Sequence, residues 1–277
     1  MREKNVLPSK HRRSHPTGDI YGLPISTTEI GYVLEEMDRA IAARENGHWM
    51  HETNTESMYH GKHIESHANF IRSCDFSLCD GVGVVVAGLA WGHRVPRVNG
   101  PILVLESCDY GRRNNWRHFF YGGGEGVADE MARRLKLKFP GLNVCGTYCP
   151  PFRELTPEED DQVVEMINAA KPDIVWVGLG LLKQDRWVAA HLGRIKAPWM
   201  IGEGGVFDYH SGNIPWAPAP LRAVGLEWLF RLILQPQLRY KRYWWSAVWA
   251  VQAIVAGLFT LQFLKAGAKK RQFASTA

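Results

Sequence analysis

The sequence predicts an α/β fold in which helices cover both faces of a mostly parallel β-sheet, followed by a C-terminal helical appendage that associates with a membrane. Three observations support this prediction. Apolar runs of strand length alternate with stretches of helical periodicity along residues 19–220. The run DIVWVGLG at residues 173–180 is apolar almost throughout, as in strands buried on both faces. Residues 243–264 carry no charge, and this segment is long enough to cross a bilayer core.

Composition limits the classes of protein that fit. The chain has 277 residues, of which 45% are hydrophobic and 22% charged, so a packed core is expected. A net charge of +5 is too small to argue for a nucleic-acid partner. The five cysteines form no C-x-x-C pair, which favours free thiols in a reducing compartment. The polar, basic N-terminus has no apolar segment of signal-peptide length, so export is not expected.

The chain divides into three predicted parts: a flexible basic arm at 1–18, the α/β domain at 19–220 and the appendage at 221–277. Within the domain, turn residues separate the predicted elements. Strands are expected at 20–25, 49–52, 76–79, 118–121, 143–148, 173–180 and 199–204. Helices are expected at 30–45, 57–74, 101–112, 127–139, 156–170 and 183–192, with an apolar segment leading from Gly83 to Trp91.

The appendage combines a basic-aromatic cluster at 239–245 with the uncharged segment. Trp244, Trp245 and Trp249 gather at one end of that segment, where a membrane interface would hold them. The polar residues within it fall on no single helical face. The sequence leaves open whether the segment spans the bilayer or lies in the interface, and a buried helix or a contact between copies of the chain is the alternative.

Asp80 stands at the end of a short apolar run and is followed by Gly81-Val82-Gly83. A carboxylate at such a turn has two interpretations. It can cap the helix that follows, as Asp often does. It can also act as a general base that faces a cleft beyond the strand end. The local sequence favours the cap, so any assignment as a base depends on the rest of the chain.

Glycines mark three other strand ends. Gly122-Gly123-Gly124 follows one strand, Gly178 and Gly180 precede Lys183 and Gln184, and Gly204-Gly205 precede Asp208. Glycines allow a backbone to approach a phosphate closely at a helix start. Together the three favour a bound nucleotide, because ligands bind beyond the carboxyl ends of parallel strands. Taken alone, the first turn fits a dinucleotide fingerprint poorly and could be an unliganded tight turn.

No metal site is predicted. No two aspartates are two residues apart, so the D-x-D pair that holds a metal-bound sugar nucleotide is absent. The histidines form no H-E-x-x-H pattern, and the sequence has no G-x-S-x-G elbow.

Taken in order, these motifs resemble the WecG/TagA/CpsF family of bacterial glycosyltransferases. The resemblance covers residues 20–243. It rests on Asn54-Thr55-Glu56, Asp80-Gly81-Val82-Gly83, Arg97-Val98-Asn99-Gly100, the Gly122–Gly124 turn, Pro172-Asp173-Ile174, Gly178-Leu179-Gly180 with Lys183-Gln184, Gly205-Val206-Phe207-Asp208, and the GLEWLFRL box at 225–232 with Pro236, Arg239 and Arg242-Tyr243.

The resemblance implies a Rossmann-like domain and inverting, metal-independent transfer without a cofactor. The donor is a UDP-sugar, and the acceptor is a polyprenyl-diphosphate-linked sugar at the cytoplasmic face of the bacterial inner membrane. Membrane lipid is expected to contact the C-terminal segment, and self-association is left open. The product belongs to exopolysaccharide or other cell-surface polysaccharide assembly.

The same resemblance assigns roles to residues. Asp80 is the base that deprotonates the acceptor hydroxyl, and Asn54 lies near the donor sugar. Gln184 and Asp208 contact the nucleotide, with Gly122, Gly178, Gly180 and Lys183 completing the donor side. Positive charge for the acceptor and the diphosphates comes from Arg97, Arg231, Arg239 and Arg242.

Three positions depart from the family's pattern. Glu52 stands where the family usually has Thr, Asp185 replaces the Glu of a P-K-Q-E box, and Trp216 replaces the Arg of R-A-P. The first and last leave the identity of the sugar open, so the enzyme is expected to be a hexosyl- or an N-acetylhexosaminyl-transferase. Two alternatives are an oxidoreductase that uses the Gly122–Gly126 turn for a nucleotide and a non-catalytic membrane scaffold.

Overall fold

The structure, a computed structural model, describes residues 15–274, with side chains described through residue 262. The predicted arm up to residue 14 lies outside the described residues. The next residues form an antiparallel hairpin of β1 (Thr17–Ile20) and β2 (Leu23–Ser26). The single strand expected at 20–25 is therefore wrong. Tyr21 and Gly22 both have positive φ, at 57° and 85°, and reverse the chain there.

Six parallel strands form the central sheet, as predicted. Their order across the sheet is β4 (Phe76–Cys79), β3 (His48–Thr53), β8 (Trp199–Gly202), β7 (Ile174–Gly178), β5 (Arg117–Gly122) and β6 (Asn143–Tyr148). Because every pair is parallel, all the strand ends that the sequence marks with glycine or a carboxylate meet at one edge.

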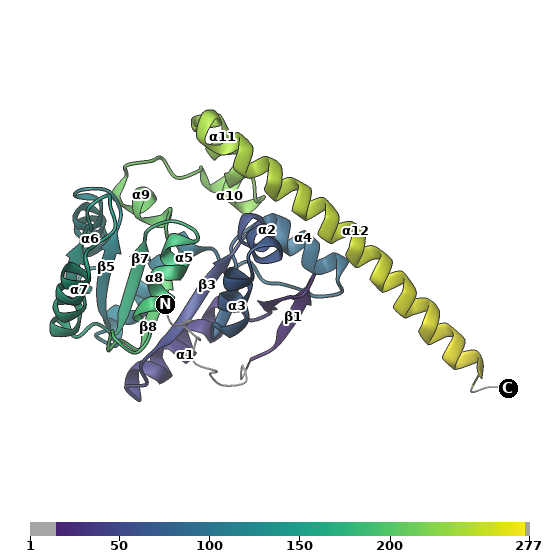
Figure 1. Ribbon diagram of the computed structural model, residues 1–277, viewed down its shortest axis with the longest axis horizontal. Helices are drawn as coiled ribbons and strands as arrows, with labels where there is room; N and C mark the ends of the chain where they lie inside the picture. The colour runs from purple at the N-terminus through teal and green to yellow at the C-terminus, as the bar shows by residue number, and fades with distance from the viewer. Residues whose placement is uncertain (1–14, 275–277) are drawn as a thin grey trace.

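Helices cover both faces of this sheet (Figure 1). One face packs against α1 (Ile30–Ala42), α5 (Gly100–Arg113), α6 (Val127–Lys138) and α9 (Val206–Ser211). The other packs against α3 (Glu65–Ser73), α7 (Pro157–Ala170) and α8 (Lys183–His191). Along β7, Ile174 and Trp176 join the first core, whereas Val175 and Val177 join the second. This alternation explains why the strand is apolar throughout.

The segment after β3 forms two helices, α2 (Thr55–His63) and α3, where the sequence predicts one helix at 57–74. The break is at Ile64, which has an extended backbone with φ −128° and ψ 102°. Helical periodicity continues across this break, so the pattern alone could not reveal it. The split lets α2 turn away from the sheet and join the hairpin and α4 (Val82–Ala90) in a third, smaller core.

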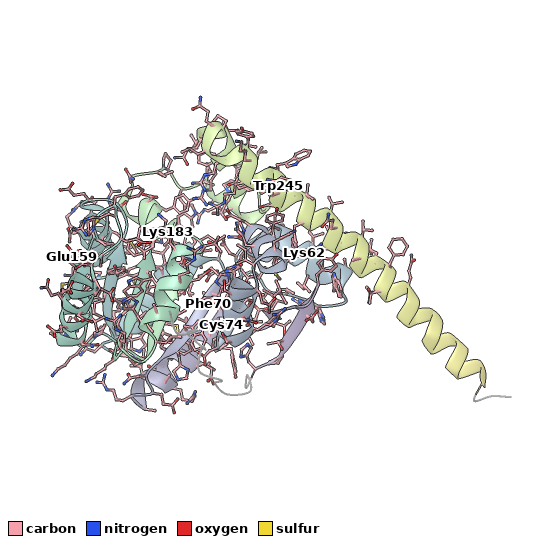
Figure 2. The ribbon with its side chains drawn as sticks, viewed as in Figure 1. Lys62, Phe70, Cys74, Glu159, Lys183 and Trp245 are labelled. Carbon is pink, nitrogen blue, oxygen red and sulfur yellow. The ribbon has the colours of Figure 1, made fainter. Side chains whose placement is uncertain are left out.

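The C-terminal region contains α10 (Ala219–Ala223), α11 (Glu227–Leu234) and the long α12 (Pro236–Ala274). The first part of α12 lies along α2 and α4, and the rest projects from the body (Figure 1). Trp249 and Ala253 are buried in the third core. Lys62 of α2 donates to Gln252, and Trp245 stacks on Tyr59 with ring centroids 5.7 Å apart. Figure 2 labels Lys62 on α2 and Trp245 on α12. The boundaries predicted at 19–220 and 221–277 stay predictions.

By length and composition, one helix among the described residues could cross a membrane, the Pro236–Gln262 part of α12. Only 22% of its most apolar window is buried against the rest of the protein. Its inner face consists of Ser246, Trp249, Ala253 and Gly257. A Cβ on Gly257 would lie 2.6 Å from Trp91, so this glycine allows the helix to approach α4 closely.

Candidate active site

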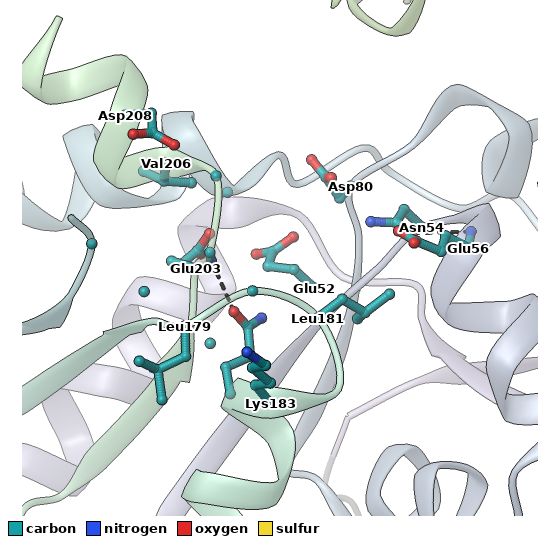
Figure 3. Close-up of a pocket in the computed structure, with 18 of the residues that line it drawn as sticks. Glu52, Asn54, Glu56, Asp80, Leu179, Leu181, Lys183, Glu203, Val206 and Asp208 are labelled. Atoms are coloured by element: carbon teal, nitrogen blue, oxygen red, sulfur yellow. Dashed lines mark hydrogen bonds between the residues drawn. The ribbon is translucent and has the colours of Figure 1, made fainter. Parts of the chain in front are cut away.

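A large pocket of about 1480 Å³ opens at the carboxyl edge of the sheet (Figure 3). Strand ends line its floor, and α11 and α12 contribute its outer wall. Every site residue that the sequence predicts lines this pocket except Gly122. The residues brought together are Asn54, Asp80, Arg97, Gly178, Gly180, Lys183, Gln184, Asp208, Arg231, Arg239 and Arg242. Gly122 instead allows close strand pairing, because a Cβ there would lie 2.6 Å from the Gly178 backbone.

Asp80 is held by a different helix from the one it was considered to cap. The N-cap of α4 is Gly81, without a side-chain cap bond, so the capping interpretation is wrong for that helix. The Asp80 Oδ1 atom instead accepts from Asn99 Nδ2 at 2.8 Å, and Asn99 is the N-cap residue of α5. The carboxylate therefore lies at the start of α5, where the helix dipole favours negative charge.

The surroundings raise the pKa of Asp80 above its ordinary value. Burial is the largest cause, and the positive charge of Arg97 opposes it. The nearby carboxylate of Glu227 raises the pKa further. A carboxylate with a raised pKa is a stronger base, which suits proton abstraction from a sugar hydroxyl.

The backbone of Asp80 is fixed by Arg97. The Arg97 Nε atom donates to the Asp80 carbonyl oxygen at 2.9 Å, and Nη1 donates to the carbonyl oxygen of Arg222. The remaining Nη2 pairs with Glu227 at the start of α11. Arg97 thus ties the loop of Asp80 to α10 and α11. Its guanidinium is already engaged by protein groups at the rim of the pocket.

Glu227 is a residue that the sequence analysis did not single out. It accepts from Trp216 Nε1 at 2.8 Å as well as from Arg97. The Arg222 guanidinium stacks 3.8 Å from the centre of the Trp216 ring. Trp216, which departs from the family's pattern, therefore belongs to the same cluster. The signal for Glu227 was its place in the GLEWLFRL box.

The opposite side of the pocket contains Lys183 and Gln184 at the start of α8 and Asp208 on α9. Gln184 is buried, and its Oε1 accepts from the Gly204 N–H at 2.9 Å. Asp208 accepts from Asn213 at 2.8 Å. Lys183 Nζ lies 5.3 Å from the ring centre of Phe152, a fully exposed residue of the loop after β6.

Asn54 is the N-cap of α2, and its Oδ1 accepts from the N–H groups of Glu56 and Ser57, both at 3.0 Å. Across the pocket from the strand ends stand Arg231 of α11 with Arg239 and Arg242 of α12. Arg242 pairs with Glu56, and Arg231 lies 4.9 Å from the ring centre of Tyr209. Three guanidinium groups thus gather on this side of the pocket, and such a cluster suits a phosphate ligand.

Two further carboxyl groups lie on the pocket floor, Glu52 at the end of β3 and Glu203 after β8. Both are buried, at 7% and 3% exposure. Sequence reasoning noted Glu52 only as a departure and gave Glu203 no role. The signal for Glu203 was its position between glycines at a strand end, which resembles that of Asp80.

Among the described residues, one trio could supply metal ligands that all lie within 4.8 Å of one another: His51, His67 and Asp185. None of the three lines the pocket. The Asp185 carboxylate contacts His51 Nδ1 at 3.3 Å and His67 Nδ1 at 3.1 Å. Ser57 Oγ joins the Nε2 atoms of both rings at 2.5 and 3.2 Å. These contacts form a closed buried network that ties α8 to β3, α2 and α3.

The fold and the pocket together indicate a class of protein. A Rossmann-like sheet whose strand ends bring a buried carboxylate and an arginine cluster into one pocket suits an enzyme that binds an anionic substrate. The sequence model of the Glycosyl transferase WecG/TagA/CpsF family matches residues 18–262, and the chain belongs to this family. It is therefore a glycosyltransferase, which excludes the oxidoreductase and the non-catalytic scaffold.

Relatives carry a more specific name. A protein of Bacillus spizizenii is 27% identical over 227 residues, covering 82% of this chain and 86% of the relative. A protein of Staphylococcus aureus is 25% identical over 221 residues, covering 78% of this chain and 84% of the relative. Both are named N-acetylglucosaminyldiphosphoundecaprenol N-acetyl-beta-D-mannosaminyltransferase.

Proposed function

We propose that this glycosyltransferase moves a sugar, with inversion, from a UDP-sugar to a sugar linked to polyprenyl diphosphate, in bacterial exopolysaccharide or other cell-surface polysaccharide assembly. One observation carries the proposal: Asp80 and the arginines of α11 and α12 face the same pocket. The relatives' names describe an acceptor sugar on undecaprenyl diphosphate, which supports the acceptor class. The motifs around Gln184 and Asp208 support a uridine nucleotide on the donor side.

In the proposed reaction, Asp80 takes the proton of the acceptor hydroxyl. The acceptor oxygen bonds to the anomeric carbon of the donor sugar from the face opposite the nucleotide. The bond from that carbon to the β-phosphate oxygen breaks, and UDP leaves with the electron pair. Inversion follows from this single displacement.

Leaving UDP gains negative charge, and cations must stabilise it in the transition state. Lys183 and the cluster of Arg231, Arg239 and Arg242 line the pocket and can supply that charge. We therefore propose that transfer needs no metal ion. The test is transfer in excess EDTA, compared with transfer in added Mg²⁺ or Mn²⁺. Loss of transfer in EDTA with recovery in Mg²⁺ would refute metal independence.

We propose that α12 lies in the cytoplasmic interface of the inner membrane instead of spanning it. Contacts to α2 and α4 continue from Arg242 to Leu261, so this stretch is attached to the protein along its length. Its outer face exposes large apolar side chains at helical spacing: Trp244, Val251, Val255, Leu258 and Phe259. A helix with one face on the protein and one apolar face exposed fits the interface plane.

The direct test is a screen of UDP-sugars with a short-chain lipid-diphosphate sugar as acceptor. We expect a glycosylated lipid product and UDP in equal amounts with at least one donor. The control is the same protein with a dolichyl or prenyl monophosphate that carries no sugar, which should give no product. Failure with every donor, in a protein that is folded and binds UDP, would contradict the proposed function.

A further inference from the structure

Glu52 and Glu203 form a pair of buried carboxyl groups at the centre of the pocket. β3 and β8 are neighbours, with His51 in register with Gly202, so the next residue on each chain stands beside the other. Figure 3 shows the two side chains together, between Asp208 and Lys183 on one side and Asp80 and Asn54 on the other. The pair therefore lies between Asp208 and Lys183, on the proposed donor side, and Asp80, the proposed base.

Apart from each other, the carboxyl groups of the pair lack hydrogen-bond partners in the protein. Both carboxyl oxygens of Glu52, and Oε1 of Glu203, are buried without a hydrogen-bond partner outside the pair. The other oxygen of Glu203 lies against the start of α5, where a Cβ on Gly100 would be 2.2 Å away. Leaving buried carboxyl oxygens unpaired is costly, and native proteins rarely do so without a functional reason. A ligand that brings hydrogen-bond donors would remove this cost.

The charge of the pair limits what that ligand can be. Burial, together with the negative charge of neighbouring carboxylates, raises the pKa of both groups well above the ordinary value. In any protonation state, two carboxyl groups have four acceptor oxygens and at most two O–H donors, so the pair offers more acceptors than donors.

We propose that Glu52 and Glu203 bind the donor sugar, and that they select a hexose with free vicinal hydroxyls over its N-acetylated counterpart. This inference rests on the proposed function and specifies its donor. A vicinal diol brings two O–H donors to carboxyl oxygens that have no partner outside the pair. An acetamido group brings one N–H donor, but it also places a carbonyl oxygen and a methyl group against acceptor-rich carboxyl groups. The chain would then differ in donor from the relatives named for N-acetylmannosamine transfer.

A divalent ion is the competing explanation for clustered carboxyl groups. The ligand atoms of Glu52, Glu203 and Asp80 do not form a group within 4.8 Å of one another, because the only such group among the described residues is the His51 trio. A single ion could not contact all three carboxylates in this arrangement. A sugar, which is several ångströms wide, can.

The test compares UDP-glucose with UDP-N-acetylglucosamine, and UDP-galactose with UDP-N-acetylgalactosamine, in two measurements. Calorimetry gives the dissociation constants, and transfer to the short-chain acceptor gives kcat/KM. We expect the wild type to favour at least one free hexose over its N-acetyl counterpart by at least about tenfold in both, since sites built for a hydroxyl reject analogues that lack it. Glu52→Gln and, independently, Glu203→Gln should bring this ratio close to one. Glutamine keeps the shape of each side chain, so folded protein is expected.

Glu125→Gln is the matched control, because Glu125 is an exposed carboxylate at another strand end and does not line the pocket. It should keep the wild-type ratio. Preference for the N-acetyl sugars, or an unchanged ratio in both glutamine variants, would overturn the inference. So would a Mg²⁺ requirement that Glu52→Gln abolishes, which would identify a metal site. If the enzyme transfers sugars without the preference, the proposed function is supported and the sugar subsite is refuted. If it binds free hexoses preferentially but transfers none, the sugar subsite is supported and the proposed function is refuted.

Discussion

Asp80 shows how a single side chain receives its role from neighbours that are distant in sequence. Its backbone is bonded to Arg97 and its carboxylate to Asn99, while Glu227 of α11 adds a nearby negative charge. None of these contacts is visible in the residues next to it. A carboxylate followed by glycines was enough to identify the candidate, but not to decide between a cap and a base.

Replacing Asp80 by Asn removes the proposed proton acceptor and keeps the shape of the side chain. We expect kcat to fall by about 10²–10⁴-fold, the usual contribution of a general base. UDP binding should change little, because Gln184 and Asp208, the residues proposed to contact the nucleotide, lie elsewhere in the pocket. Stopped-assay kinetics and calorimetry with UDP measure the two effects. Near-normal turnover of Asp80→Asn would remove Asp80 as the base.

The raised pKa of Asp80 predicts the pH dependence of transfer. The base must be ionised, so kcat/KM should fall as the pH is lowered through a value above the ordinary aspartate value of about 3.9. Glu227 raises the pKa of Asp80, so Glu227→Gln should move this acid limb to lower pH. A pH–rate profile of both proteins measures the shift. An acid limb at or below the ordinary aspartate value would contradict the assignment.

At the scale of elements, the network of His51, Ser57, His67 and Asp185 joins four segments behind the pocket. Burial alone would raise the pKa of Asp185, but the two histidines outweigh burial and hold that pKa well below its usual range. The network fixes the start of α8, where Lys183 and Gln184 stand. The sequence analysis saw Asp185 only as a departure from P-K-Q-E, since its partners come from three other elements.

Asp185→Asn should destabilise the fold by about 3–5 kcal/mol at neutral pH, the usual cost of breaking a buried ion pair. A carboxylate with a lowered folded pKa contributes stability above its unfolded value of about 3.9, and this contribution is lost as the pH falls through the folded value. The difference in the free energy of unfolding between wild type and Asp185→Asn should therefore become smaller at acidic pH. Urea unfolding at neutral and acidic pH measures it.

The matched control for Asp185 is Asp161→Asn. The side chain of Asp161 is 73% exposed although it pairs with Arg194, so its loss should cost no more than about 1 kcal/mol. Equal unfolding free energies for wild type and Asp185→Asn would show that the network does not stabilise the fold.

At the scale of the whole molecule, α11 and α12 complete a pocket that the sheet alone would leave open. They supply Arg231, Arg239 and Arg242, and α12 also fills the third core with Trp249 and Ala253. The appendage therefore connects the candidate active site to an exposed apolar surface. This link places the site next to any membrane on which that surface rests.

Truncation after Leu234 should abolish both membrane association and transfer, because it removes two of the pocket arginines together with the apolar face. Vesicle sedimentation and the transfer assay measure the two losses. A fully active truncate would show that α12 is not needed to close the site.

A milder change separates the two roles of α12. Val255→Glu with Phe259→Glu places charges only on its exposed face. We expect weaker binding to anionic vesicles but nearly normal transfer to a soluble short-chain acceptor, because the inner face and the arginines are unchanged. Unchanged vesicle binding would contradict a membrane role for this face.

The sequence by itself determined the parallel sheet, the glycine-rich strand ends and the carboxylate at Asp80. These features depend on local periodicity and on residues with restricted backbone preferences, which a single chain displays directly. Tertiary structure decided the rest. It turned residues 20–25 into part of a hairpin, divided the helix after β3, and placed Glu203 beside Glu52 from a strand about 150 residues away in sequence.

The orientation of α12 shows most clearly why the sequence alone could not decide these features. Its buried face is distinguished by small residues such as Ala253 and Gly257 around Trp249, whereas its exposed face carries large apolar ones. Hydropathy cannot separate two faces that are both apolar. Only the close approach of α12 to α4, which requires a residue without a side chain, decides which face meets the protein and which stays exposed.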